Sequence, residues 1–284
     1  MFRCYDERAF LEELLALQTD ATAHAPPDAF GPFRILHQIG AGALGPVFRA
    51  YHPDEDRLVA IKVFRLDLPP ERVDRLVTEF RKLIALDLDH AAVAAPIAAG
   101  VAGPSAYLAL DFVAADPLDV FSRGPGRLDP AEVSRITSQL AAAIDAAHLA
   151  GVVHGALHPR DVLVSPDEAR LTGLGIVQAL EAIGVDVPVR PPYSAPERGA
   201  RGVWDRRADT FSTAAMSFEL LFGRPQVSQP GSRAAEAITA TARGNVTELR
   251  DVFARGLAEH PGDRFQTASA FADALGRALS LIHI

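Results

Sequence analysis

A single cysteine, Cys4, occurs among the 284 residues, so no disulfide can form within the chain. Disulfides are common in secreted proteins and rare in the cytosol, so we expect a cytoplasmic protein. The sequence also lacks a basic excess, because its formal net charge is -8 at pH 7. Nucleic acids and anionic membranes attract basic surfaces, so we expect neither of them to be the main partner.

No run of apolar residues reaches the roughly 18 that a membrane-spanning helix needs. The most apolar stretch, residues 91–103, is shorter and is interrupted by Pro96. Near the N-terminus, charged side chains stand where a signal peptide would carry its apolar segment: Arg3, Asp6, Glu7 and Arg8. The sequence therefore predicts neither a membrane span nor a signal peptide.

What the sequence does contain is a change of pattern along its length. Residues 6–18 have apolar side chains at helical spacing, and the proline-rich stretch that follows, up to residue 30, is typical of a linker. Residues 31–113 are rich in strand patterns, with one amphipathic helix over 70–86. Helical patterns dominate residues 114–277. We therefore expect an α+β architecture with two lobes.

A glycine-rich turn lies between the first two predicted strands. The segment IGAGALGPVF holds Gly40, Gly42 and Gly45 in G-x-G-x-x-G spacing. A tight hairpin needs glycine for positive φ, so this pattern alone leaves a purely structural role open. The turn joins two strands, however, whereas the dinucleotide fingerprint joins a strand to a helix. The next strand ends in VAIK at Lys62, and this combination is the phosphate-covering arrangement of protein kinases.

Over residues 31–277 the chain resembles a protein kinase domain of the bacterial Ser/Thr type. Its LALDFVA segment looks like the hinge between lobes, and YSAPERG carries the A-P-E motif that ends in Glu197. HPGDRFQ places Arg264 where the family pairs an arginine with that glutamate. The resemblance implies a small β-rich N-lobe over about 31–113 and a larger helical C-lobe over about 114–277.

The resemblance also implies a nucleotide site. Backbone amides of the turn and the lysine would approach the phosphates, while apolar side chains and hinge backbone groups would hold the base. The residues at these family positions are Gly40, Gly42, Gly45, Val47, Ala60, Lys62, Asp111, Val113 and Leu163. Glu79 is the expected partner of Lys62 if two extra residues are accommodated near Asp87; without that gap, Arg81 takes the position.

The catalytic loop departs from the family pattern H-R-D-x-K-P-x-N, because residues 154–161 read HGALHPRD. Ala156 stands where an aspartate would accept the substrate proton, and losing a general base costs about 10²–10⁴ in rate. His158 replaces the lysine that steadies the γ-phosphate, and an imidazole is mostly neutral at pH 7. Asp161, at the asparagine position, is a weak candidate metal ligand.

The metal-binding motif D-F-G is altered as well. LTGLG places Gly173 at the position of the aspartate that binds magnesium in the family. Proteins hold magnesium through only one or two carboxylates, so Asp161 is left alone and we expect weak magnesium binding or none. Restoring a carboxylate at 156 or 173 is expected to leave stability nearly unchanged if the site faces solvent.

Activation by phosphorylation is not expected either. Gly155 replaces the arginine that grips a phosphorylated loop residue in the family, and residues 174–193 contain neither serine nor threonine. Arg190 stands at the position of the usual threonine. The residues that stack as the internal frame of the fold are retained, by contrast: Leu83, His154, Leu174 and Asp209.

The sequence thus predicts a pseudokinase that acts as a nucleotide-binding or scaffolding module with protein partners in signalling. ATP or another nucleotide is the expected ligand, with Lys62 and the glycine-rich turn favouring binding and the lost metal site opposing it. Two alternatives stay open. One is a weakly active Ser/Thr kinase, and the other is a nucleotidyl transferase that binds ATP in a flipped orientation.

The tail, residues 278–284, prompts a separate hypothesis. LSLIHI is the hexapeptide that a transposon end used in sequencing libraries encodes in one frame. On this interpretation the natural chain is longer and continues toward a membrane anchor or another domain. The alternative is a last helical turn packed on the large lobe.

Overall fold

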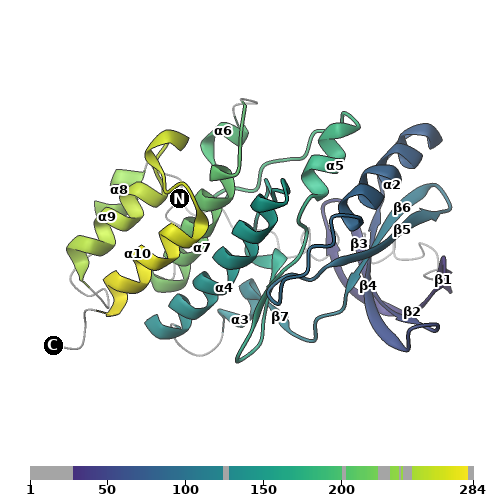
Figure 1. Ribbon diagram of the computed structural model, residues 1–284, viewed down its shortest axis with the longest axis horizontal. Helices are drawn as coiled ribbons and strands as arrows, with labels where there is room; N and C mark the ends of the chain where they lie inside the picture. Colours follow the sequence, from purple (N-terminus) through teal and green to yellow (C-terminus); the bar gives the residue numbers. More distant parts are fainter. Residues whose placement is uncertain are drawn as a thin grey trace, which may run out of the picture.

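The computed structural model describes residues 28–123, 128–199, 203–222, 231–236, 238 and 245–280 (Figure 1). The predicted helix at 6–18 and the last four residues, 281–284, lie outside the described residues. Two lobes, one built on a β-sheet and one of helices, follow each other along the chain (Figure 1). The expected two-lobed α+β architecture is confirmed.

Six antiparallel strands form the sheet of the N-lobe. They are β1 (Ala29–Phe30), β2 (Phe33–Gly42), β3 (Gly45–His52), β4 (Arg57–Phe64), β5 (Pro96–Ala102) and β6 (Ser105–Asp111), in the spatial order β1-β2-β3-β4-β6-β5. Side chains alternate between the two faces of a strand. In β6, Leu108 and Leu110 pack on one side and Tyr107 and Ala109 on the other, and all four are buried. Both faces of the sheet are therefore covered.

Helix α2 (Pro70–Ile84) covers one of these faces. It begins with a proline in its first turn and ends with basic residues near its C-terminus, as the helix macrodipole favours. Its apolar residues recur at helical spacing and are buried: Val73, Leu76, Val77, Phe80 and Leu83. Aromatic side chains cover the opposite face of the sheet: Phe30, Phe33, Phe48 and Tyr107.

The C-lobe combines a small sheet with helices. The strands are β7 (Asp116–Pro117), β8 (Val162–Val164) and β9 (Ala169–Leu171), in that order. The described helices are α3 (Leu118–Phe121), α4 (Pro130–Leu149), α5 (Ile176–Ala182), α6 (Pro196–Gly199), α7 (Arg207–Phe222), α8 (Gly231–Glu236), α9 (Val246–Gly256) and α10 (Ala268–Ser280).

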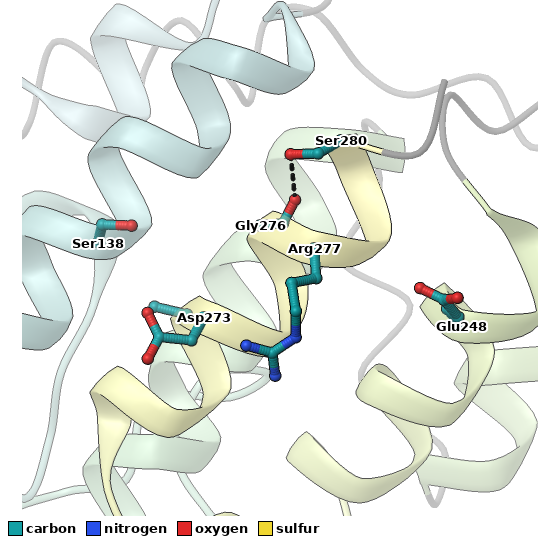
Figure 2. A pocket seen from close by; sticks show the side chains of 7 residues that line it. Ser138, Glu248, Asp273, Gly276, Arg277 and Ser280 are labelled. Carbon is teal, nitrogen blue, oxygen red and sulfur yellow. Dashed lines mark hydrogen bonds between the residues drawn. The ribbon is translucent and has the colours of Figure 1, made fainter. Parts of the chain in front are cut away.

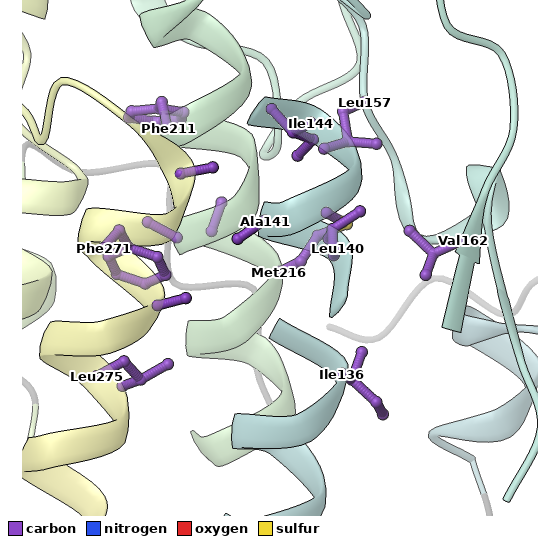
Figure 3. Close-up of a cluster of buried hydrophobic side chains, with 14 of the residues drawn as sticks. Ile136, Leu140, Ala141, Ile144, Leu157, Val162, Phe211, Met216, Phe271 and Leu275 are labelled. Carbon is purple, nitrogen blue, oxygen red and sulfur yellow. The ribbon is translucent and has the colours of Figure 1, made fainter. Parts of the chain in front are cut away.

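Helices α4, α7 and α10 build the core of the C-lobe (Figure 3). Most residues of α7 are buried, and many are small, which lets its neighbours approach closely. Figure 3 shows Ile136, Leu140 and Ile144 along α4, Met216 of α7 next to Leu140, and Phe271 of α10 on the left. This core holds the loops that carry the candidate site in fixed positions.

Candidate functional site

The glycine-rich turn joins β2 to β3 as a tight hairpin, with Gly42 paired to Gly45. Gly45 is required by the fold, because its φ is +137° and a Cβ there would lie 2.2 Å from the carbonyl oxygen of Val63. Gly40 and Gly42 are different, because the nearest atoms to a Cβ built on them are 4.0 and 3.8 Å away, which is ordinary contact. Packing therefore requires a glycine at position 45 but not at positions 40 and 42.

Lys62 lies on β4 directly opposite Val47 of β3. Opposite residues share a face, as do residues two apart on one strand, so Lys62, Val47 and Ala60 project from the same side of the sheet. Burial lowers the pKa of Lys62, while the charge of Asp161 raises it and that of Arg190 lowers it. Three residues of the predicted nucleotide site therefore share one face of the sheet.

The predicted partner of Lys62 is bonded elsewhere. The Glu79 carboxylate accepts a hydrogen bond of 2.8 Å from Lys82, one helical turn further along, and within the described ranges no ion pair joins it to Lys62. Arg81, the alternative at this position, is exposed and carries the wrong charge. The prediction of a Lys62–Glu79 pair is therefore wrong for this structure.

The reason lies in α5, which follows Gly173 and packs beside α2 (Figure 1). Apolar residues of the two helices share one buried cluster: Leu76, Phe80, Ile176 and Leu180. Arg72 of α2 donates from Nη2 and Nε to the carbonyl of Ile183, at 2.6 and 3.2 Å, and so closes the end of α5. Because α5 occupies this face of α2, Glu79 is left on the flank beside Lys82.

The catalytic-loop segment, residues 154–161, is anchored to α7 through Asp209. The amides of His154 and Gly155 donate to this carboxylate at 2.9 and 2.8 Å, and Nε2 of His148 lies 3.0 Å from it. Burial by itself raises the pKa of Asp209, but the hydrogen bond from His148 and the other contacts outweigh it, so that the pKa is lowered. The expected frame contact between His154 and Asp209 is confirmed.

Trp204 fills the space beside Gly155. This glycine has a φ of +74°, and a Cβ on it would lie 2.6 Å from the indole ring. A larger residue is therefore excluded by both backbone and packing at the position where the family carries its arginine. Ala156, the next residue, is buried with 4% of its surface exposed and contributes only a methyl group.

Asp161 is the carboxylate that remains in this loop, and Arg190 neutralises it. Nη1 of Arg190 donates to Oδ2 of Asp161 and, at 3.0 Å, to the carbonyl of Ala156. Nε2 of His154 lies 3.7 Å from the same carboxylate oxygen. Arg190 therefore already occupies the carboxylate of Asp161, which the sequence suggested as a metal ligand.

Sequence reasoning identified Arg190 only as the replacement of a threonine. Arg190 is the one charged residue within 187–194, and prolines follow at 191 and 192, but this local pattern does not indicate a partner. The contact with Asp161 joins residues 29 apart in the chain, and nothing in the local pattern announces it.

Gly173 also occupies a position that disfavours a side chain. Its φ is +87°, and a Cβ there would lie 3.0 Å from Nε2 of His154. A carboxylate at 156 or 173 is expected to leave stability nearly unchanged only if the site faces solvent. Ala156 is buried, and the left-handed backbone of Gly173 disfavours any side chain, so a carboxylate should cost stability at both positions. In the described part of the chain, no group of three or more His, Cys, Asp or Glu side chains is arranged to hold a metal ion.

His158, at the position of the family lysine, has a pKa below its ordinary value, which agrees with the expectation that it is mostly neutral at pH 7. Burial lowers its pKa, and the charge of Arg190 lowers it further. Its Nδ1 accepts a hydrogen bond of 3.1 Å from the amide of Arg160, and its ring lies edge-on to that of Tyr193. His158 therefore positions the loop and adds no positive charge.

The two hinge residues differ in what they can offer a base. The amide of Asp111 already donates to the carbonyl of Ala95 at 2.9 Å, and its carboxylate pairs with Arg57, so this amide is not free to contact a base. The carbonyl of Val113 accepts from Ala115. The amide of Val113 has no hydrogen-bond partner among the described residues, which makes it the available hinge donor.

Side chains expected to line a base are half-buried: Val47, Ala60 and Leu163. Leu163 lies on β8, opposite Arg170 of β9. The frame residues Leu83 and Leu174 belong to one buried cluster, as predicted.

The predicted ion pair between Arg264 and Glu197 is confirmed. Two guanidinium nitrogens of Arg264 donate to the two carboxylate oxygens of Glu197, at 2.6 and 2.8 Å. Arg264 exposes 1% of its surface and the Glu197 side chain 11%, so the pair is largely buried. It fixes the A-P-E segment to the helical lobe.

Two hollows of the C-lobe lie away from these residues. One, of about 710 Å³, opens between α4, α9 and α10, where Figure 2 shows Ser138, Glu248 and Arg277 at its rim. The other, of about 510 Å³, is lined by residues that include His148, Gln178 and Trp204. Neither contains a residue of the predicted nucleotide site.

Comparisons with known proteins agree with this geometry. The family described as "Protein kinase domain" matches residues 33–269. The serine/threonine-protein kinases PknF and PknE of Mycobacterium tuberculosis are 32% and 31% identical to this chain, over 90% and 88% of it. The chain spans only 58% and 47% of the length of these two relatives.

Solved structures show the same likeness. The kinase domain of PknI from Mycobacterium tuberculosis, crystallised as a cysteine-to-alanine mutant, superposes with a TM-score of 0.71 at 28% identity. The match covers 90% of this chain and 99% of that domain. Among the helices that the structure describes, none is both long and apolar enough to cross a membrane.

Proposed function

Because this chain belongs to the protein kinase family, we propose that it is a pseudokinase, a nucleotide-binding or scaffolding domain that serves protein partners in signalling. The proposal rests on the residues found at the three positions that accept the proton and bind the metal in the family. Ala156 and Gly173 supply no carboxylate, and the remaining acid, Asp161, is bonded to Arg190. In this family an aspartate accepts the substrate proton, and carboxylate groups anchor the metal.

Several features support nucleotide binding. Gly40 and Gly42 have room for a side chain that they lack, which suits close approach of a phosphate to the backbone. Lys62 carries a cation on the same face as the apolar Val47. The free amide of Val113 offers a hinge hydrogen bond to a base.

Magnesium, which the family generally uses with ATP, does not fit the residues present. Asp161 offers one carboxylate, and that carboxylate is already neutralised by a guanidinium. Magnesium keeps near-ideal octahedral geometry and is usually bound through one or two protein carboxylates together with substrate phosphates. We propose that any magnesium bound with the nucleotide is held weakly. A cytoplasmic location stays a prediction from the single cysteine.

A radiolabel assay of phosphotransfer to itself and to generic protein substrates, run beside a thermal-shift titration with ATP, tests this function. We expect a shift in melting temperature with ATP and no incorporation of label. Label that Lys62→Met abolishes would establish the second candidate, a weakly active Ser/Thr kinase, which the names of the relatives favour. If ATP causes no thermal shift and no label is incorporated, the scaffolding role remains and nucleotide binding is excluded.

A further inference from the structure

Charge around the loop residues 154–161 is unbalanced. Arg190 and Asp161 cancel each other, His158 is neutral, and Lys62 adds a cation that no carboxylate in the described ranges pairs with. A largely buried ammonium is costly without an anion beside it. The group as a whole therefore favours an anionic ligand.

Arg190 has hydrogen-bonding capacity to spare. Both of its side-chain bonds, to Asp161 and to the carbonyl of Ala156, leave from Nη1. Its Nε and Nη2 donate to no residue in the described part of the chain, and the side chain keeps 31% of its surface exposed. A guanidinium presents its donors in a planar fork that matches phosphate oxygens.

The backbone around Arg190 is fixed before any ligand arrives. Its amide donates to Oγ of Ser194 at 2.8 Å, and its carbonyl accepts from the amides of Tyr193 and Ser194 at 3.0 and 3.3 Å. The Tyr193 hydroxyl is in turn bonded to Glu219 of α7. The guanidinium is thus held from both ends, by this turn and by Asp161.

We infer that Arg190 takes the place of the metal cation: the site binds the phosphates of a metal-free nucleotide between Lys62 and Arg190. This rests on the proposed nucleotide-binding function and adds to it the form of the ligand, a free nucleotide di- or triphosphate. Arg190 lies against Asp161, and the charges of both residues act on the pKa of Lys62, so the two cations lie near enough for one polyphosphate to contact both.

Isothermal titration calorimetry of the full chain with ATP in EDTA, and then in magnesium, tests the inference. Wild type should bind ATP in EDTA, and magnesium should not strengthen binding. Arg190→Ala should weaken binding in EDTA by about 10–100-fold, the loss of one charged hydrogen-bonding group. Arg190→Lys, which keeps the charge, should retain part of the affinity, and the thermal melting of both variants checks that they fold.

One control separates Arg190 from its surroundings. Arg160→Ala removes an exposed arginine of the loop 154–161 that is bonded to Asp119 and not to Asp161, and it should bind ATP like wild type.

Four results would overturn the inference. If Lys62→Met abolishes binding in EDTA but Arg190→Ala does not change it, Arg190 holds no phosphate, while the proposed nucleotide-binding function stands. If Arg190→Ala binds more tightly in EDTA, Arg190 blocks the site. A tightening of about tenfold by magnesium would assign a true metal site. If wild type binds ATP in neither buffer, the nucleotide-binding function itself fails.

Discussion

Truncation of Arg264 to alanine should destabilise this protein more than any other arginine change considered. The guanidinium exposes 1% of its surface and makes two hydrogen bonds to Glu197. It also donates to the carbonyls of Ala258 and Glu259 at 2.8 and 2.9 Å, and to that of Arg207 at 3.2 Å. Arg264→Ala therefore leaves one largely buried carboxylate and three carbonyl groups without their hydrogen-bond donor.

The expected magnitude follows from the burial of the pair. Removing one partner of a buried ion pair costs about 3–5 kcal/mol. In a domain of this size each kcal/mol shifts the melting temperature by about 2–4 °C, so Arg264→Ala should melt about 6–20 °C below wild type. Against a total stability of about 5–15 kcal/mol, this change is a large fraction.

Thermal and urea denaturation of purified variants measure the effect. Arg277→Ala is the matched control, because it removes the same charge from an exposed position on α10 and should change stability by less than about 0.5 kcal/mol. Glu197→Gln, which leaves the arginine unpaired, should fall between these two variants. If Arg264→Ala melts with wild type, the A-P-E segment is not fixed by this pair and the account of the C-lobe is wrong.

Three further outcomes follow from single positions. Gly155→Ala should destabilise more than Gly151→Ala in urea denaturation, because both glycines have left-handed φ values (+74° and +75°) but only the Cβ at 155 meets a ring, at 2.6 Å; equal midpoints would contradict this. Leu180→Ala should cost about 2–5 kcal/mol, because its side chain is fully buried between α5 and α2, and a loss below about 1 kcal/mol would show that the two helices do not pack together. Asp209→Asn should make the stability depend less on pH in acid. The pKa of Asp209 is lowered in the folded state, so its contribution to stability is present above the unfolded value of 3.8 and is lost as pH falls through the folded value. If the variant loses stability below about pH 4 as steeply as wild type, this reasoning is refuted.

The fold could be predicted well because its signals are local. The strand patterns within residues 31–113 and the helical spacing over 70–86 depend on residues a few positions apart, and the strands of the N-lobe and helix α2 form within these ranges. The ion pair of Arg264 was predicted as well, although it joins residues 67 apart, because the resemblance to the family supplied the pairing.

The amino-acid sequence alone also determined what the site cannot do. A methyl group at Ala156 accepts no proton, and Gly173 provides no metal ligand, whatever the fold around them. Only the tertiary structure decided which partners the remaining charges find. Glu79 bonds to Lys82 because α5 fills the face of α2, and Arg190 reaches Asp161 because the chain returns there after 29 residues. Chemical identity belongs to each residue by itself, whereas an ion pair depends on the path of the whole chain between its two ends.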